Sequence, residues 1–337
     1  MIHRLNANSI FKCLMWIVLV LIGVTTIKTL NDRYSSMLQF HRCDNMDKNL
    51  TKPVLDHEHP RNASIIFIGG HQSTGTGLMR ILLDVHPMVR CGPEPIITWE
   101  VMNFRKSVGP YRNKLVASGV DSHVIDEATA AFIVSVIENM GPPAKRLCHK
   151  QPGIYYHLHD LGDLFPQAKF IHMIRDGRAA VLSTVARKID SQFSGDNPVS
   201  AIKLWHNITK QMIDDCNYIG KKRCLTVRYE CLVLYPELQL RRILKFLDLP
   251  WDPVLLKHEN VVHNISKLNF QEASTSQFIK PIHIESLNSW TKNSSIFPQI
   301  FLRKFHEYTN LLNETGYLTD HIPPNYKELC RTAHIHE

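Results

Sequence analysis

A short apolar run that enters a glycine-rich turn and then an amphipathic helix constrains this chain most. The segment is Ser64-Ile-Ile-Phe-Ile-Gly-Gly-His-Gln-Ser-Thr-Gly-Thr-Gly-Leu-Met-Arg80. Gly70 and Gly75 have the spacing that opens a P-loop, in which backbone N–H groups and a helix N-terminus bind phosphate. A P-loop triphosphatase also needs a lysine, and this chain has Thr76 there. The segment therefore predicts an anion site that handles a phosphorylated ligand without Mg-nucleotide hydrolysis.

Apolar segments of strand and helix type alternate along the rest of the chain. We expect strands over 65–68, 146–149, 169–174 and 224–227, and helices over 76–85, 124–139, 158–165, 179–187, 199–218, 236–247 and 298–313. Strands separated by helices predict an α/β fold with a central parallel sheet flanked by helices. Ligands of such sheets bind outside the carboxyl ends of the strands, where we place Gly70, Arg175 and Arg228.

An uncharged run near the N-terminus predicts a signal-anchor transmembrane helix over residues 13–30. Basic residues precede the run and no acidic residue does, which favours a cytoplasmic tail over residues 1–12 and a luminal body. The alternative is a cleaved signal peptide, but Thr25-Thr26-Ile27 offers no small-residue cleavage site. The polar residues 31–62 are typical of a luminal stem, and we expect a catalytic domain over 63–330 and a short tail over 331–337.

Sequons and cysteines agree with a luminal body. Six N-x-S/T sequons begin at Asn49, Asn62, Asn207, Asn264, Asn293 and Asn313. Seven cysteines lie beyond the anchor: Cys43, Cys91, Cys148, Cys216, Cys224, Cys231 and Cys330. Their spacing fits no zinc template, so we expect disulfides, and an odd count leaves at least one cysteine unpaired.

The charge of the chain is modestly basic, with a formal net charge of +8. It has no long Lys/Arg run and no basic stripe with interleaved aromatic residues, so we expect no nucleic-acid partner. An anionic small molecule or an acidic polypeptide suits this charge better.

A second basic turn follows the strand expected over 169–174. Arg175 and Arg178 lie just past this strand, and Ser183 lies in the next expected helix. A guanidinium near a hydroxyl is a suitable clamp for a second phosphate. The alternative is a salt bridge from one of these arginines to Asp176 at the start of the helix.

Several longer motifs resemble one protein family. They are Phe67–Gly70, Leu78–Arg80, Leu83–Gly92, Leu147–Pro152, Leu164–Phe170, Arg175–Ala179, Tyr229–Leu234, Ser274–Pro281 and Pro323–Tyr326. The chain resembles the sulfotransferases that use 3′-phosphoadenylyl sulfate, and most closely the tyrosylprotein sulfotransferases of the Golgi. The resemblance covers most of Ile65–Tyr326 and implies a P-loop-like sulfotransferase fold.

The resemblance implies sulfuryl transfer from 3′-phosphoadenylyl sulfate, without a metal, to tyrosine hydroxyls of secreted or membrane proteins. It also implies a homodimer in the Golgi membrane, single-pass type II, with disulfides Cys216–Cys224 and Cys91–Cys148. The donor-binding residues implied are Ser73, Thr74, Gly75, Thr76, Gly77, Arg175, Ser183, Arg187, Tyr229 and Lys280.

The chemistry of the transfer assigns three catalytic residues by the same resemblance. A phenol with a pKa of about 10 needs a base as its oxygen attacks sulfur, and Glu94 matches the family's glutamate. Charge on the transferring group and on the leaving oxygen must be stabilised, and Lys150 and Ser274 match the residues for this task.

The chain departs from the family at the turn and near the acceptor. Ser73 stands where the family has an arginine and Gly77 where it has a hydroxyl residue, while Ile96 and Glu100 replace two arginines that contact the acidic acceptor. Two alternatives therefore stay open: a catalytically weak homologue that acts as a luminal peptide-binding or partner protein, and a carbohydrate sulfotransferase. Protonated His71 would partly replace the missing arginine.

Overall fold

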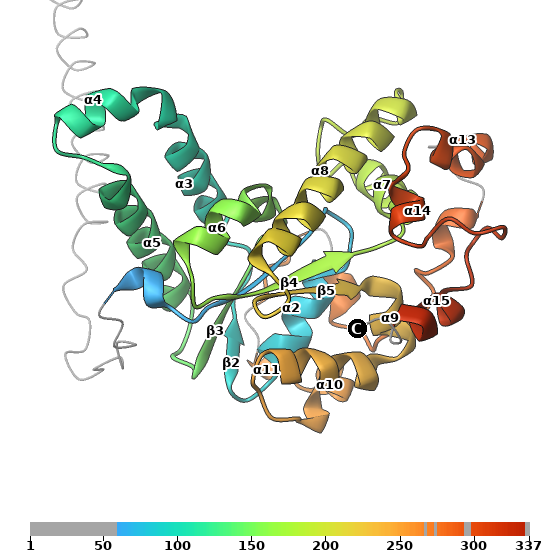
Figure 1. Cartoon of the computed structure of the whole chain (residues 1–337). Coiled ribbons are helices and arrows are strands. Elements are labelled where there is room, and N and C mark those ends of the chain that lie inside the picture. The colour runs from blue at the N-terminus through green and yellow to red at the C-terminus, as the bar shows by residue number, and fades with distance from the viewer. Residues whose placement is uncertain (1–58, 266–267, 273–274, 293–297, 334–337) are drawn as a thin grey trace, which may run out of the picture. The chain divides into compact units, whose positions relative to one another are not determined.

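Strand β1 (Ile66–Gly69), which leads into the glycine-rich turn, lies in the middle of a five-stranded parallel sheet. The other strands are β2 (Val89–Cys91), β3 (Arg146–Lys150), β4 (Lys169–Ile174) and β5 (Cys224–Arg228). Their order is β2-β3-β1-β4-β5 (Figure 1). The chain passes from β1 to β2 and β3 on one side of β1 and then crosses to β4 and β5 on the other side. The crevice at the carboxyl end of β1 is therefore the expected ligand site.

The computed structural model describes residues 59–265, 268–272, 275–292 and 298–333, which belong to the compact unit Leu55–Glu337. The predicted cytoplasmic tail, anchor and most of the stem lie outside the described residues. No helix within those ranges combines the length and apolarity needed to cross a membrane.

The longer elements that surround the sheet are helices. They are α2 (Thr76–Asp84), α3 (Ile96–Ser107), α4 (Arg112–Ala117), α5 (Ser122–Asn139), α6 (Leu158–Leu164), α7 (Gly177–Ala186), α8 (Pro198–Ile219), α9 (Tyr229–Leu234), α10 (Pro236–Phe246) and α15 (Tyr326–Ala333). The remaining helical segments are α11 (Val262–Ile265), α12 (Thr275–Phe278), α13 (Gln299–Arg303), α14 (Leu311–Glu314), η1 (Pro60–Asn62), η2 (Gly109–Tyr111), η3 (Pro152–His157), η4 (Pro253–Asn260), η5 (Ser289–Thr291) and η6 (Phe305–Glu307).

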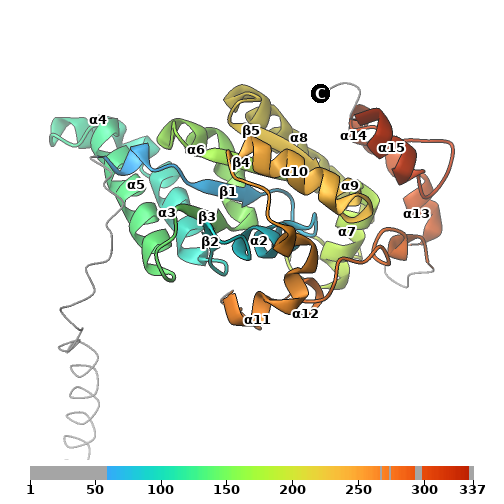
Figure 2. The same cartoon turned by 90° about the horizontal axis from the view of Figure 1, so that it is seen from below.

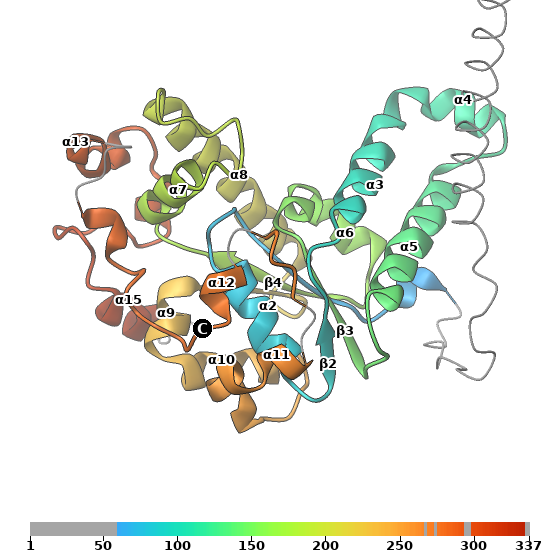
Figure 3. The same cartoon turned by 180° about the vertical axis from the view of Figure 1, so that it is seen from behind.

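The alternating side chains of β1 build a core on each face of the sheet. Phe67 packs with residues of η3, α5, α6 and α8 on one face, whereas Ile66 and Ile68 pack with α2 and α10 on the other. The result is a three-layer α/β/α arrangement, with α6 and α8 on one side and α2 and α10 on the other (Figure 1). Figure 2 shows α3 and α5 side by side, and Figure 3 shows α12 against α2. The predicted α/β fold with a parallel sheet is confirmed.

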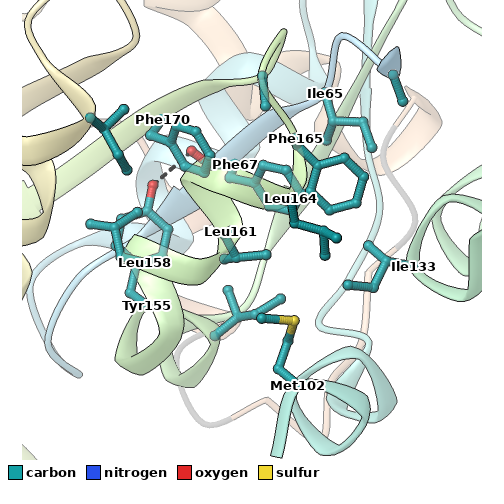
Figure 4. Close-up of a cluster of buried hydrophobic side chains, with 14 of the residues drawn as sticks. Ile65, Phe67, Met102, Ile133, Tyr155, Leu158, Leu161, Leu164, Phe165 and Phe170 are labelled. Carbon is teal, nitrogen blue, oxygen red and sulfur yellow. Dashed lines mark hydrogen bonds between the residues drawn. The ribbon is translucent and has the colours of Figure 1, made fainter. Parts of the chain in front are cut away.

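Tyr155 ties the central strands together from within the core. Its hydroxyl lies 2.9 Å from the carbonyl oxygens of both Phe67 and Ile171, which share its one proton, and its ring lies among Phe67, Leu158 and Phe170 (Figure 4). A Cβ atom at Gly69 would overlap this ring. Gly69 therefore lets η3 pack directly onto the end of β1.

Most predicted elements are confirmed to within about two residues, as expected for boundaries set by sequence pattern. The single helix expected over 298–313 is wrong. Lys304 has φ −91° and ψ 8°, which ends α13 and lets Phe305 pack edge-on against Trp205 with their ring centroids 5.5 Å apart. Burial of Phe305 therefore competes with a continuous helix.

Three disulfides join elements of the described chain, and one of them, Cys216–Cys224, joins the consecutive elements α8 and β5. Cys91–Cys148 and Cys216–Cys224 are confirmed, and Cys231–Cys330 was not predicted. The third disulfide ties α9 to α15 across a sequence separation of 99 residues. Cys43 lies outside the described residues.

A buried polar network holds the C-terminal segment against the turn after β4. Asp176 caps α7 and accepts a hydrogen bond from the Tyr326 hydroxyl at 2.9 Å. Glu230 accepts from the Asp176 N–H at 2.9 Å and from the Tyr317 hydroxyl at 2.8 Å. Arg178 pairs with Asp176 at 2.8 Å and donates to the Tyr317 carbonyl. Residues far apart in the chain thus fix the start of α7.

Candidate active site

The turn between β1 and α2 has a backbone that needs glycine at two positions. Gly70 has φ +145° and Gly75 has φ +93°, and added Cβ atoms would overlap the Met173 carbonyl oxygen and the Tyr229 ring, respectively. The Thr74 hydroxyl donates to the His71 carbonyl at 2.6 Å and closes the turn. Because the first amides of a helix lack partners within it, the start of α2 presents N–H donors to an anion.

Arg175 faces this turn from the end of β4. Its guanidinium donates to the Ser73 carbonyl at 3.0 Å and to the Ser286 carbonyl at 2.8 Å, and lies 4.6 Å from the centre of the Tyr229 ring. The Tyr229 hydroxyl hydrogen-bonds to the Ser286 side chain. These contacts hold a cation beside the glycine-rich turn without a carboxylate partner in the described chain.

Together these residues line a first cleft. Its lining consists of Ser73, Gly75, Thr76, Gly77, Leu78, Arg175, Ser183, Arg187, Tyr229, Val233, Gln277, Lys280, Pro281, Ile282, His283 and Ser286. Nine of the ten residues predicted to bind the donor are among them. The exception is Thr74, which is buried and serves the turn itself.

Arg178 forms the salt bridge to Asp176 that the sequence analysis gave as the alternative to an anion clamp. Its side chain is buried, pairs with both oxygens of Asp176 and lies over the Trp290 ring. The interpretation of Arg178 as part of an anion clamp is therefore wrong, because its charge already has a buried partner. Arg175 remains the arginine that faces the cleft.

His71 does not supply the missing charge of the turn. Burial lowers the pKa of its imidazole to about 4, so the ring is neutral near pH 7. Because the ring is uncharged, the interpretation of His71 as a substitute cation is wrong. Ser73, at φ +67°, is held by Arg187 instead, whose guanidinium donates to its hydroxyl at 2.6 Å.

A second cleft contains the predicted base and its lysine. Its lining consists of Gln72, Ser73, Thr76, Glu94, Trp99, Lys150, Gln151, Pro152, Gly153, Tyr156, Arg187, Ile189, Asp190, Ser191, Gln192, Leu204, Ile208 and Glu272. Lys150, the last residue of β3, has a 1% exposed side chain and forms ion pairs with Glu94 and, at 3.1 Å, with Glu272. The structure therefore brings Glu94 and Lys150 into direct contact.

Glu272 is a site residue that the sequence interpretation missed. One of its carboxylate oxygens accepts from the Glu94 N–H at 3.0 Å while the other pairs with Lys150. It lies 122 residues beyond Lys150 in a segment without regular periodicity, so no sequence signal linked the two. Ser274, predicted to be catalytic, lies outside the described residues.

Aromatic and aliphatic side chains complete the second cleft. Trp99 and Tyr156 have ring centroids 6.4 Å apart, and Leu204 and Ile208 of α8 also line the space. A cleft with an apolar wall opposite a charged carboxylate and amine suits a ring that carries one ionisable group.

The two clefts meet at three residues. Ser73, Thr76 and Arg187 line both of them. A group held at the start of α2 is therefore exposed to the cleft that contains Glu94 and Lys150, which is the geometry that a direct group transfer requires.

Comparisons with known proteins agree on one family. The model of the sulfotransferase family matches residues 65–253. Protein-tyrosine sulfotransferase A of Caenorhabditis elegans is 36% identical over 95% of this chain and 87% of its own length. Protein-tyrosine sulfotransferase 1 of Danio rerio is 33% identical over 97% of this chain and 93% of its own length.

The solved structures support the fold independently. The sulfotransferase domain of the Synechococcus PCC 7002 olefin synthase has a TM-score of 0.54 at 20% identity, covering 78% of this chain and 97% of that one. The model match and the full-length similarity to named enzymes show that this chain is a transferase that belongs to the protein-tyrosine sulfotransferases of the sulfotransferase family.

Proposed function

We propose that the chain transfers a sulfuryl group from 3′-phosphoadenylyl sulfate to tyrosine hydroxyls of secreted or membrane proteins in the Golgi lumen. The observation that carries the proposal is the junction of the two clefts at Ser73, Thr76 and Arg187. The donor would lie in the first cleft, and its sulfuryl group would face the second. The relatives' names supply the tyrosine acceptor.

The first cleft has the charge that the donor requires. The phosphosulfate would take the amides of Gly75, Thr76 and Gly77, and Arg175 with Ser183 would take the 3′-phosphate. The hydrogen bonds of Arg175 within the described chain go to carbonyl oxygens, so a phosphate would be the first anion to accept one.

Glu94 and Lys150 would divide the chemistry of the transfer. The phenolic oxygen attacks sulfur while its proton passes to Glu94. The bond from sulfur to the bridging oxygen breaks, the electron pair stays on the phosphate, and Lys150 stabilises that oxygen. In the free protein Lys150 forms an ion pair with the Glu94 carboxylate. A bound donor competes for Lys150 and leaves the carboxylate available to the phenol.

Features outside the clefts support a luminal, membrane-anchored protein. The described sequon asparagines Asn62, Asn207, Asn264 and Asn313 are all exposed, and six cysteines form three disulfides. With the expected anchor over residues 13–30, these features suit a single-pass type II protein of the Golgi membrane. We include the homodimer in the proposal, and sedimentation of the luminal body tests it.

Radiolabelled 3′-phosphoadenylyl sulfate and a tyrosine peptide test the function directly. We expect label on the tyrosine with the parent protein, and loss of nearly all transfer with Lys150→Ala. A phenylalanine version of the peptide is the control for the acceptor atom. Folded protein that binds the donor but labels no peptide would support the catalytically weak partner protein instead, and label on a glycan would support a carbohydrate sulfotransferase.

A further inference from the structure

The loop between α7 and α8 places one carboxylate in the lining of the second cleft. Asp190 lines this cleft and not the first. Its carboxylate accepts a hydrogen bond from the Gln192 N–H at 2.9 Å. The buried Phe193 packs edge-on against the His71 ring, with the ring centroids 5.1 Å apart, and holds the loop beside the glycine-rich turn. The position of Asp190 is therefore fixed by the fold around it.

The charge of Asp190 differs from that of the other carboxylates in this lining. Glu94 and Glu272 both form ion pairs with Lys150. The other cation of the lining, Arg187, lies where the two clefts meet. Asp190 forms no salt bridge with any residue that the structure describes. A cation carried by a ligand of the second cleft would be its first partner of opposite charge.

The field of this carboxylate reaches the aromatic side chains of the cleft. Burial is the larger cause and the Asp190 charge the smaller one of a pKa of about 12 for the Tyr156 hydroxyl. Tyr156 lies beside Trp99, with ring centroids 6.4 Å apart. A phenol ring held against these two side chains would therefore have the Asp190 charge close to its neighbours in the peptide.

The α3 side of the cleft also combines apolar side chains with an acid (Figure 1). Trp99 lines the cleft from α3, and Ile96 and Glu100 lie within one turn of it on the same side of the helix. Both are exposed, and Glu100 forms no salt bridge within the described part of the chain. Ile189 is likewise exposed beside Asp190. Each side of the cleft thus offers an apolar contact and a negative charge.

We infer that the second cleft selects a tyrosine flanked by basic and apolar residues, and that the carboxylates of Asp190 and Glu100 recognise the basic side chains. The inference rests on the proposed function and names the class of its acceptor. An acidic residue beside the tyrosine would meet like charges, which disfavours the wrong partner. The nearby basic residue Lys188 is exposed but does not line the cleft. Asp190 and Glu100 touch no reacting atom and determine specificity only.

Three peptides of equal length test this preference. Each has one tyrosine between apolar residues, with lysine, asparagine or aspartate at two positions on each side. We expect kcat/KM for transfer of label to be highest for the lysine peptide and lowest for the aspartate peptide. Each step should be about two- to fivefold, the range of partly exposed ion pairs, and should shrink as salt is added.

Variants test the two carboxylates. Asp190→Asn keeps an oxygen for the Gln192 N–H and removes the charge, so it should fold and lower the ratio of the lysine to the aspartate rate by about threefold. Adding Glu100→Gln should remove most of the remaining preference. Glu237→Gln, exposed on α10 and outside both clefts, is the matched control and should keep the parent's ratio.

Phenylalanine versions of the peptides separate this inference from the proposed function, because calorimetry measures their binding without transfer. If no tyrosine peptide is labelled but the lysine version binds most tightly and loses this advantage in Asp190→Asn, the transfer is overturned and the charge recognition stands. Equal rates and equal affinities for the three peptides would overturn the inference and leave the function. Faster labelling of the aspartate peptide would also overturn it and assign recognition to Lys188.

Discussion

Lys150 is a nearly solvent-free cation held between Glu94 and Glu272. At the residue scale this arrangement explains how one glutamate can serve as a base beside a fixed positive charge. Glu272 satisfies both Lys150 and the backbone of Glu94, so Glu94 can leave the lysine without exposing a buried unpaired charge. The proposed catalytic pair, Glu94 and Lys150, thus forms a triad of charges with Glu272 in the free protein.

Glu94→Gln should retain donor binding and lose transfer. The amide cannot take the phenolic proton, and general bases typically contribute about 10²–10⁴-fold to a rate. Transfer of label to a tyrosine peptide measures the rate, and calorimetry with adenosine 3′,5′-bisphosphate measures the site. Glu237→Gln, on the exposed face of α10, is the control. A rate within threefold of the parent's, at roughly unchanged affinity, would contradict the assignment of Glu94 as the base.

Glu272→Ala should destabilise the fold by about 1–3 kcal/mol, since Lys150 and the Glu94 N–H would each lose a partner in a partly buried site. Glu272→Gln keeps an oxygen for the N–H and should recover part of that loss. Denaturant unfolding measures the two free energies. Equal stability of Glu272→Ala and the parent would show that water replaces the carboxylate without cost.

At the scale of elements, the start of α7 depends on a segment 150 residues away. Tyr326 of α15 donates to Asp176 and accepts from the Trp290 indole N–H at 3.2 Å. Burial and the neighbouring carboxylates Asp176 and Glu230 raise the pKa of the Tyr326 hydroxyl far above its usual range, so it remains a donor. The position of α7 in turn places Ser183 and Arg187 in the first cleft.

Tyr326→Phe should lower the free energy of unfolding by about 1–3 kcal/mol, because it leaves the Trp290 N–H without its acceptor and removes one of the two donors to Asp176 Oδ2. It should also weaken nucleotide binding. Leu318→Ala, an exposed position near the same segment, is the control for truncation of a side chain. If Tyr326→Phe alters neither stability nor binding, the network does not position α7.

Sequence pattern predicted some elements well and missed others for physical reasons. β4 agrees at both ends because a continuous apolar run between polar residues has one favourable register. α3 was missed because Ile96, Ile97 and Phe104 are exposed on it, so its apolar residues form no buried stripe. Glu272 could not be found from sequence, because its role comes from contact with residues far away in the chain.

At the scale of the whole molecule, three buried histidines make stability depend on pH. Burial lowers the pKa of His71 and His172 to about 4 and that of His149 to about 3. Neither ring nitrogen of His172 has a hydrogen-bond partner. Above pH 6.5 these rings are neutral in both the folded and the unfolded protein. Below pH 6.5 the unfolded chain binds protons that the folded chain does not bind.

Stability should therefore fall as the pH drops from about 6.5 toward 4. At pH 5 each histidine would cost about 2 kcal/mol, and three of them about 6 kcal/mol, against a total of about 5–15 kcal/mol for a typical domain. Denaturant unfolding at pH 7 and pH 5 measures the difference. His172→Leu should reduce that difference by about one third, and a variant with the parent's pH dependence would rule out His172 as a contributor.

The C-terminal network has a consequence for synthesis of the chain. A ribosome makes Asp176, Arg178 and Glu230 long before Tyr317 and Tyr326, and until then the network lacks the hydroxyls of the two tyrosines and the Tyr317 carbonyl. Most of the sheet can form on the nascent chain, whereas the first cleft takes its final shape only when the last helix arrives. The order of translation itself would then keep an unfinished chain from binding the proposed donor.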